Sequence, residues 1–265
     1  PDWRDQIIYF LMIDRFDDGN PNNNRQGTDE FDPADGARYS GGDLAGITRR
    51  LDYIQGMGAT AIWITPPNAH QWWDPVKRYG GYHGYWGADF AKVDPHFGDL
   101  AAYQKLSDAM HRKGMFLIQD IVVNHTGNYF HCGKTGSPAQ ACTVHSNQGG
   151  APLKFPFTQN DARKAAHRKA GIYHWTPEIE DFSDPTQLER WQLAGLDDLD
   201  TDNAVVREVL RKSFGHWIGA VGVDGYRVDT AFYVQPEFFE DFLYSKSERA
   251  PGIDVVARAN GRQQF

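Results

Sequence analysis

Short apolar runs alternate along the chain with longer segments in which apolar residues recur every three or four positions. The runs are rich in β-branched residues and resemble strands buried on both faces. They lie at 7–13, 61–64, 116–123, 223–229 and 254–257. The segments between them have the period of amphipathic helices, at 44–54, 100–110 and 206–217. Strand and helix therefore alternate, which predicts repeated βα units around a parallel sheet.

Residues suited to helix ends flank these helical segments. Asp43, Asp99 and Asn203 stand just before them, where a side-chain oxygen can accept from a free backbone N–H group of the first turn. Gly58 and Gly114 stand just after the first two, where a helix often ends in a left-handed residue. The ends of the predicted helices thus agree with their apolar period.

One interval, residues 126–196, interrupts the alternation directly after the third predicted strand. It is rich in Gly, Pro, Asn and His, and it contains both cysteines. Long loops in compact domains are usually functional, and barrel enzymes place their sites on loops that follow strands. We therefore predict a catalytic barrel from residues 1–125 and 197–265, and an inserted irregular subdomain from residues 126–196.

Two α/β architectures fit the alternation, a closed barrel and a doubly wound open sheet. The doubly wound folds that bind dinucleotides carry a Gly-x-Gly-x-x-Gly turn after the first strand, and that turn is missing. The barrel is therefore the favoured prediction. Five predicted strands would form an incomplete (β/α)₈ TIM barrel, truncated after about the fifth strand.

Composition and charge narrow the class of partner. The 265 residues are 40% apolar and 14% aromatic, enough for a substantial core. A net charge of -8 argues against nucleic acid, which binds to clustered Lys and Arg. No apolar run approaches the roughly 20 residues that span a bilayer, so we expect no membrane partner. Cys132 and Cys142 suit a local disulfide if the protein is exported, or two reduced thiols if it is cytoplasmic.

The fourth predicted strand ends in a cation beside a carboxylate. Arg227 and Asp229 are two residues apart, so their side chains share one face of the strand. The cation favours the ionised carboxylate that a nucleophile requires. A plain structural ion pair at a strand end explains the same pattern, so the pair alone does not identify a site.

The third predicted strand ends in a second polar cluster, formed by Asp120, Asn124 and His125. Polar side chains gather where a barrel strand opens into its loop. Asn124 also begins an N-glycosylation pattern with His125 and Thr126. We rank that interpretation below the site, because a strand end is buried.

These residues carry a resemblance to the alpha-amylase family of glycoside hydrolases. Residues 120–125 and 225–229 resemble the first and second signature regions of that family, and 82–86 is similar to its substrate-binding loop. Residues 196–200 resemble the short signature near the end of its inserted subdomain. The similarity continues to about Tyr233, and the motifs occur in the family's order.

The resemblance implies a role for each matching residue. Asp229 would be the nucleophile and Arg227 its partner, while His83 and His125 would donate to hydroxyls of the glucose being cleaved. Tyr85 would stack beneath that ring, because an aromatic face suits the C–H face of a sugar. Further substrate contacts are expected from Trp86, Asp120 and Tyr233. Outside this motif, core packing would be the simpler interpretation of Tyr85 and Trp86.

The resemblance also implies two Ca²⁺ sites, because hard oxygen ligands suit this ion. The first would use Asn124 and Asp198, near the insertion. The second resembles an N-terminal loop of cyclodextrin glucanotransferases, and its candidate ligands are Asp18, Asn20, Asn23, Asn24, Gly41 and Asp43. An ordinary Asn and Gly turn is the alternative for that loop.

The chain departs from the family pattern at three places. Phe232 and Tyr233 stand where a Lys-His pair is expected. The general acid, a Glu at the end of the fifth strand, is expected near Arg258, where the sequence has no carboxylate. The sequence also ends at Phe265, before the sixth to eighth strands. We therefore expect a truncated or nicked enzyme that is inactive without the C-terminal part of the same protein.

The sequence thus predicts a secreted or periplasmic, retaining hydrolase of α-1,4 bonds in starch-like glucans. A transglycosylase of the same family is the first alternative. Against it, Ala194 stands four residues before Asp198, where cyclising relatives place an aromatic. The second alternative is a glucan-binding protein that lacks the general acid and catalyses no reaction.

Overall fold

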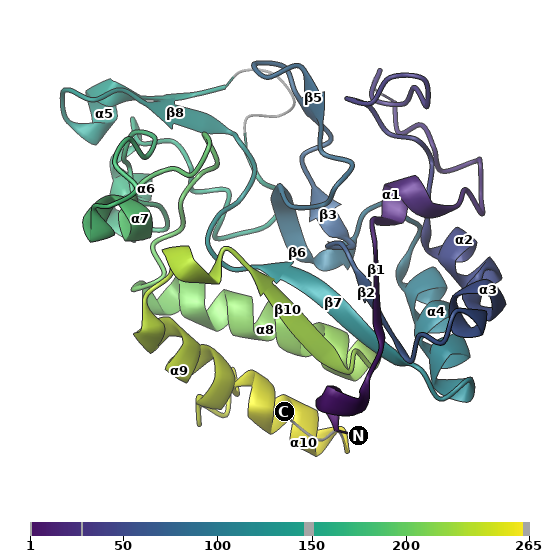
Figure 1. Cartoon of the computed structure of the whole chain (residues 1–265). Coiled ribbons are helices and arrows are strands. Elements are labelled where there is room, and N and C mark those ends of the chain that lie inside the picture. The colour runs from purple at the N-terminus through teal and green to yellow at the C-terminus, as the bar shows by residue number, and fades with distance from the viewer. Residues whose placement is uncertain (1, 28, 146–150, 262–265) are drawn as a thin grey trace.

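A parallel sheet forms the centre of the computed structural model, which describes residues 2–27, 29–145 and 151–261 (Figure 1). Within these residues the sheet has four strands in the order β1-β2-β7-β10. Their bounds are Ile8–Leu11, Ala61–Ile64, Phe116–Val122 and Gly225–Asp229. All three pairings are parallel, so the carboxyl ends of the strands lie at one edge. The first four predicted strands are confirmed, each within a few residues of its expected bounds.

Helices cover one face of this sheet (Figure 1). They are α2 (Leu44–Arg49), α3 (Leu51–Gly56), α4 (Leu100–Arg112) and α8 (Ala204–Ala220). The predicted helix at 44–54 is therefore two helices, which meet at Arg50. The sheet residues that face these helices, such as Ile62, Leu117 and Ile121, are fully buried. The apolar positions of the predicted helices and strands thus identified residues of the hydrophobic core.

The predicted helix ends are also confirmed. Asp43 accepts a hydrogen bond from the backbone of Gly46, and Asp99 accepts one from Ala102. Asn203 caps α8 in the same way, through the backbone of Val205. Gly58 and Gly114 have φ of +89° and +70°, the left-handed geometry expected of a residue that ends a helix.

The predicted strand at 254–257 is wrong, because these residues belong to helix α10 (Ile253–Ala259). Ile253 and Ala257 are one helical turn apart and both are buried. The helix packs beside α8 and α9 (Pro236–Tyr244). A short apolar run cannot distinguish a buried strand from a buried helix by period alone. The position near Arg258 is therefore not a strand end.

Residues 68–93 form small strands that the sequence did not predict. β3 (Asn68–His70) pairs antiparallel with β6 (Gly87–Val93), and β4 (Trp73–Asp74) pairs with β5 (Tyr79–Gly80). Three of the four are only two or three residues long. Such strands are too short for an alternating pattern to be visible. They carry the loop of residues 81–86 to the carboxyl edge of the sheet.

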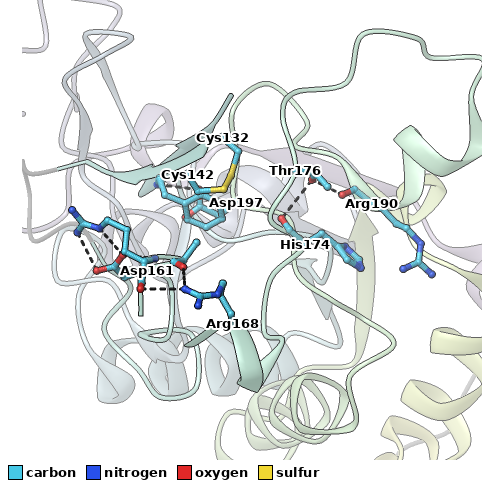
Figure 2. The surroundings of a disulfide bond; sticks show 11 residues. Cys132, Cys142, Asp161, Arg168, His174, Thr176, Arg190 and Asp197 are labelled. Carbon is cyan, nitrogen blue, oxygen red and sulfur yellow. Dashed lines mark hydrogen bonds and ion pairs between the residues drawn. A yellow bond between two sulfur atoms is a disulfide. The ribbon is translucent and has the colours of Figure 1, made fainter. Parts of the chain in front are cut away.

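The elements that the structure describes between residues 126 and 196, apart from the gap at 146–150, are all short. They are β8 (Phe130–Cys132), α5 (Pro138–Ala141), β9 (Cys142–Val144), α6 (Ala165–Ala170) and α7 (Pro185–Arg190). Cys132 and Cys142 face each other across the β8–β9 pair and form a disulfide, as predicted for an exported protein (Figure 2). Subdomain bounds at 126 and 196 remain a prediction.

Both edge strands of the sheet leave apolar side chains uncovered. At β1, the residues Ile7, Ile8 and Phe10 are 60%, 48% and 45% exposed. A cavity of about 470 Å³ lies beside β10, and its lining includes Val228 and Phe242. Within the described residues the sheet is therefore open at both edges, with β1 and β10 as its edge strands. None of its helices is both long enough and apolar enough to span a bilayer.

The remaining elements are short helical turns. They are η1 (Trp3–Asp5), α1 (Ile13–Phe16) and η2 (Ala231–Tyr233). The last of these directly follows β10 through Thr230, whose φ of +54° is left-handed. The chain therefore turns sharply away from the sheet immediately after Asp229.

Candidate active site

The polar ends of β7 and β10 meet through a single guanidinium. Arg227 Nη1 donates to Asp229 Oδ1 at 2.6 Å, and to both oxygens of Asp120 at 3.2 and 3.1 Å. Arg227 and Asp229 share a strand face, as expected, and Asp120 is the register partner of Arg227 on β7. Asp120, from the second polar cluster seen in the sequence, therefore joins Arg227 and Asp229. Asp229 is its more accessible carboxylate, with its side chain 24% exposed against 0% for Asp120.

Asp120 is the buried anchor of this cluster. It accepts hydrogen bonds from the Tyr85 hydroxyl at 2.8 Å and from Trp63 Nε1 at 2.9 Å, in addition to those from Arg227. Burial raises the pKa of Asp120 to about 6, and the three donors oppose that rise. Trp63 was missed as a site residue in the sequence. Its position between the helix-facing Ile62 and Ile64 on β2 was the available signal, because it places Trp63 on the other face.

The loop of residues 81–86 adds a group of aromatic rings above Asp120. The His83 and Tyr85 rings stack at 5.7 Å, and the Trp86 ring meets His83 edge-on at 4.8 Å. The backbone N–H of Tyr85 donates to His83 Nδ1 at 3.1 Å, so the neutral His83 ring carries its proton on Nε2. Burial lowers the pKa of His83 to about 3. Burial also raises the pKa of Tyr85, which keeps its hydroxyl protonated.

His125 and Asn124 end the same edge of the sheet and are 1% and 2% exposed. Burial lowers the pKa of His125 to about 4, although the charge of Asp229 acts in the opposite direction. Its Nε2 atom is buried and has no hydrogen-bond partner among the described residues. A buried polar atom without a partner is costly unless a ligand or a water molecule satisfies it. The burial of Asn124 argues against its use as a glycosylation acceptor.

Tyr233 lies apart from these rings, at the end of η2. Its ring packs edge-on against Phe232 at 6.1 Å, and Phe232 is 78% exposed. Both side chains follow the nucleophile candidate Asp229 by only a few residues. The structure therefore places an aromatic pair where the family pattern has a Lys-His pair.

The N-terminal loop predicted to bind Ca²⁺ folds around Asp43. The Asp43 carboxylate accepts from the backbone of Gly19 at 3.1 Å and of Asn20 at 2.8 Å, and from Asn23 Nδ2 at 3.2 Å. Asn24 Nδ2 donates to Asp18 Oδ2 at 2.7 Å. The structure thus brings together the side chains that the sequence selected.

Three oxygens of this loop remain buried without a hydrogen-bond partner in the described part of the chain. They are Asp18 Oδ1, Asn23 Oδ1 and Asn24 Oδ1. Gly41 has φ of +96°, and a Cβ there would lie 2.7 Å from Asn24 Nδ2. Unsatisfied buried oxygens are costly, and a hard cation would satisfy them. The loop therefore fits Ca²⁺.

The second predicted Ca²⁺ site pairs Asn124 with Asp198, next to the insertion. Asp198 Oδ2 accepts from His174 Nδ1 at 2.6 Å, while Asp198 Oδ1 is buried without a partner among the described residues. Burial raises the pKa of Asp198 to about 7, opposed by hydrogen bonds from His174 and Asn124. No group of three or more His, Cys, Asp or Glu side chains suited to a metal occurs in residues 2–27, 29–145 and 151–261. Backbone or amide oxygens would have to complete this site.

A parallel sheet that gathers a carboxylate, a guanidinium and stacked aromatic rings at its carboxyl edge is typical of a sugar-cleaving barrel enzyme. The sequence matches the family model "Alpha amylase, catalytic domain" over residues 10–259. The chain therefore belongs to the alpha-amylase family of glycoside hydrolases. This result confirms the resemblance found in its signature regions.

Relatives in this family are similar over nearly all of the chain. The chain is 35% identical to a β/α-amylase of Paenibacillus polymyxa, and the match covers 91% of this chain and 18% of that protein. It is 32% identical to a cyclomaltodextrin glucanotransferase of Klebsiella oxytoca, over 93% of this chain and 36% of that protein.

One solved structure shows the same fold with a ligand. It is the alpha-amylase of Geobacillus thermoleovorans in complex with acarbose, at 34% identity and a TM-score of 0.68. The match covers 96% of this chain and 45% of that one. The chain thus spans less than half the length of each of these three relatives.

Proposed function

We propose that this chain carries the nucleophile of a retaining glycoside hydrolase that cleaves α-1,4-glucosidic bonds in starch-like glucans. One observation carries the proposal: Arg227 Nη1 bonds both Asp229 and the buried Asp120. This contact holds the more exposed carboxylate in place at the carboxyl edge of the sheet, below the stacked rings of His83 and Tyr85. The ligand named for the Geobacillus relative supports a glucan-like substrate.

In the proposed reaction, an Asp229 oxygen attacks the anomeric carbon and forms a covalent glycosyl ester. The bond from that carbon to the leaving oxygen breaks, and the leaving oxygen takes a proton from a second carboxylic acid, which in retaining enzymes lies about 5 Å from the nucleophile. Water then cleaves the ester. Asp120 is poorly suited to be that acid, because its oxygens already accept from Trp63, Tyr85 and Arg227. We propose that the acid belongs to the part of the catalytic domain that corresponds to the remaining length of the relatives.

The other residues bind the sugar in this proposal. His83 and His125 are neutral at pH 7 and offer Nε2 atoms to glucose hydroxyls. The Tyr85 ring lies against the C–H face of the sugar, with Trp86 supporting the loop. Tyr233, with Phe232, contacts a neighbouring glucose unit.

We propose Ca²⁺ as a structural ion of this protein. Asp18, Asn23 and Asn24 supply the unsatisfied oxygens of the N-terminal site, with Asn20, Gly41 and Asp43 shaping the loop around them. Asn124 and Asp198 supply the second site. When bound, the ion supplies positive charge that satisfies buried oxygens and fixes these loops.

A transglycosylase and a binding protein without catalysis are the alternatives. The similarity to a cyclomaltodextrin glucanotransferase favours the first. Ala194 opposes it, because a small residue with φ of +53° stands where cyclising relatives place an aromatic. The disulfide between Cys132 and Cys142 supports an oxidising compartment, and we propose that the protein is secreted or periplasmic.

The nucleophile is tested with a 5-fluoro-α-maltosyl fluoride. Fluoride leaves without protonation, so the first step needs no general acid. We expect a stable mass increase on the chain that maps to Asp229 and is absent in Asp229→Asn. Labelling that maps to another residue would refute Asp229 as the nucleophile. No labelling of a chain that binds maltoheptaose would refute the retaining mechanism and favour the binding protein.

A further inference from the structure

Gln71, which follows β3, joins two loops at the carboxyl edge of the sheet. The side chain is 5% exposed. Its Oε1 accepts from the backbone N–H of Asn128 at 2.8 Å, and its Nε2 donates to the backbone C=O of Asn128 at 3.1 Å. These two bonds connect Gln71 to the segment that follows β7. The side-chain amide pairs with the Asn128 backbone as a neighbouring strand would, through one donor and one acceptor.

The backbone of Gln71 holds the opposite loop. Its N–H donates to the C=O of Trp86 at 2.8 Å, and the N–H of Gly127 donates to the C=O of Gly87 at 3.0 Å. Trp86 adjoins Tyr85, whose ring stacks on His83. Gln71 thus lies between the aromatic loop and the strand end that bears His125.

The chain closes tightly on Gln71 from two sides. A Cβ at Gly127 would lie 2.7 Å from Gln71 Oε1, and one at Gly81 would lie 1.9 Å from the Gln71 backbone oxygen. Real Cβ atoms do not approach other atoms this closely, so neither position has room for a side chain.

Asn128, the partner of Gln71, is itself held in place. Its Nδ2 donates to Asp74 Oδ2 at 2.8 Å, and its Oδ1 bonds His145 Nε2 at 3.1 Å. Both sides of the Gln71 pairing are therefore rigid, and a change at Gln71 will be transmitted to the loops it joins.

We propose that Gln71 is a positioning residue that sets the aromatic loop of residues 83–86 against the strand end at His125. It acts through Trp86 and Asn128. The consequence for sugar binding rests on the proposed function, whereas the placement of the loop does not.

The test is Gln71→Met in the full chain. Methionine has a side chain of similar length but neither donates to the Asn128 C=O nor accepts well from the Asn128 N–H, at any pH, so both bonds are lost. We expect the loop to open, so that the pKa of His83, measured by NMR titration of its ring, rises by about one unit or more from its buried value of about 3. We also expect maltoheptaose affinity, measured by calorimetry, to fall at least about tenfold.

Gln119→Met is the matched control. Gln119 is also buried, but it lies on the helix-facing side of β7, where its Oε1 accepts from Tyr103 at 3.0 Å. It should leave the His83 titration and the affinity unchanged. If Gln71→Met does not fold, Gly127→Ala presses on the amide of Gln71 from the other loop and should give the same His83 shift.

The outcomes separate the two proposals. An unchanged His83 titration in a folded Gln71→Met or Gly127→Ala chain refutes the positioning role. A shifted His83 with no maltoheptaose binding by the unsubstituted chain supports the positioning role and refutes the glucan substrate. If the His83 titration of the variant shifts but its affinity for maltoheptaose does not change, the placement of the loop does not control sugar binding.

Discussion

Arg227 and Asp120 are register partners on adjacent parallel strands, and their side chains meet 107 residues apart in sequence. The same Arg227 nitrogen bonds Asp229 at 2.6 Å. One guanidinium therefore fixes the nucleophile candidate relative to a fully buried carboxylate. The geometry needs one donor nitrogen that reaches both carboxylates at once.

Arg227→Lys tests this requirement. Lysine keeps the charge, but its nitrogen lies on a shorter and more flexible side chain and does not occupy the position of Nη1. We expect covalent labelling by the maltosyl fluoride to slow by about 100-fold, or roughly 2.7 kcal/mol. Arg211→Lys is the control, because Arg211 pairs with Asp241 on α9. The rate is read by mass spectrometry over time. An unchanged rate for Arg227→Lys would show that charge alone is sufficient.

Tyr85 combines a stacking ring with a hydroxyl that binds Asp120. Tyr85→Ala removes both, and we expect maltoheptaose affinity to fall at least about tenfold. Tyr85→Phe keeps the ring but leaves the buried Asp120 short of a donor, so it should cost about 1–3 kcal/mol of stability with little loss of affinity. Calorimetry and urea unfolding separate the two effects. Equal affinity for Tyr85→Ala and the unsubstituted chain would exclude stacking at this ring.

Calcium should stabilise the folded chain. At about 100 times its dissociation constant the ion adds roughly 2.7 kcal/mol for one site, visible as a melting temperature that is higher with Ca²⁺ than after removal of the metal with EGTA. Asp18→Ala and Asn24→Ala should weaken that response, and Asp198→Asn should weaken the part due to the second site. Asp32→Ala is the control, because Asp32 is exposed and its carboxylate accepts from Ala34, outside both proposed sites. A melting temperature that does not respond to Ca²⁺ contradicts both sites.

His96 should make stability depend on pH. It is buried between Asp94 Oδ1 at 2.8 Å and Glu30 Oε1 at 3.1 Å. Burial lowers the pKa of His96, but the two carboxylates outweigh it and raise the value above the ordinary 6.5. Because the folded pKa is the higher one, the contribution to stability is complete below about pH 6.5 and is lost as the pH rises through the folded value.

Urea unfolding of His96→Gln between pH 6 and pH 9 provides the measurement. At pH 6 the variant leaves two buried carboxylates short of their cation, a loss of about 3–5 kcal/mol. The difference in unfolding free energy between the variant and the unsubstituted chain should shrink toward pH 9, because His96 of the unsubstituted chain then loses its proton and its positive charge. A deficit that is constant across this range would mean that His96 is neutral in the folded protein.

The disulfide should stabilise the insertion, because it reduces the conformational entropy of the unfolded chain. Cys132 and Cys142 are 10 residues apart, and closing so short a loop contributes about 2–3 kcal/mol. The double variant Cys132→Ser with Cys142→Ser should lose that amount in urea unfolding. A reducing agent should lower the stability of the unsubstituted chain to the same level and leave the variant unaffected. A variant of unchanged stability would contradict this role.

The parts of the fold that depend on neighbouring residues were predictable. Helix caps such as Asp43 and Asp99 act within one turn, and the shared face of Arg227 and Asp229 follows from the two-residue period of a strand. The structure of the apolar run at 254–257 was not predictable, because an isolated apolar run does not show whether it will itself form a helix or a strand. Here the packing against α8 and α9 decided for a helix.

The sequence by itself determined the repeated βα pattern, the family signatures and the residue types of the site. Only the tertiary structure decided which residues bond to one another. Arg227 and Trp63 both donate to Asp120, and the side chain of Gln71 forms two hydrogen bonds with the backbone of Asn128. Such contacts depend on strand register and loop closure across 50 or more residues, as the separations of 107 and 57 show. A local pattern holds no information about register, because many distant segments could satisfy the same hydrogen bonds and only the packing of the whole core selects one.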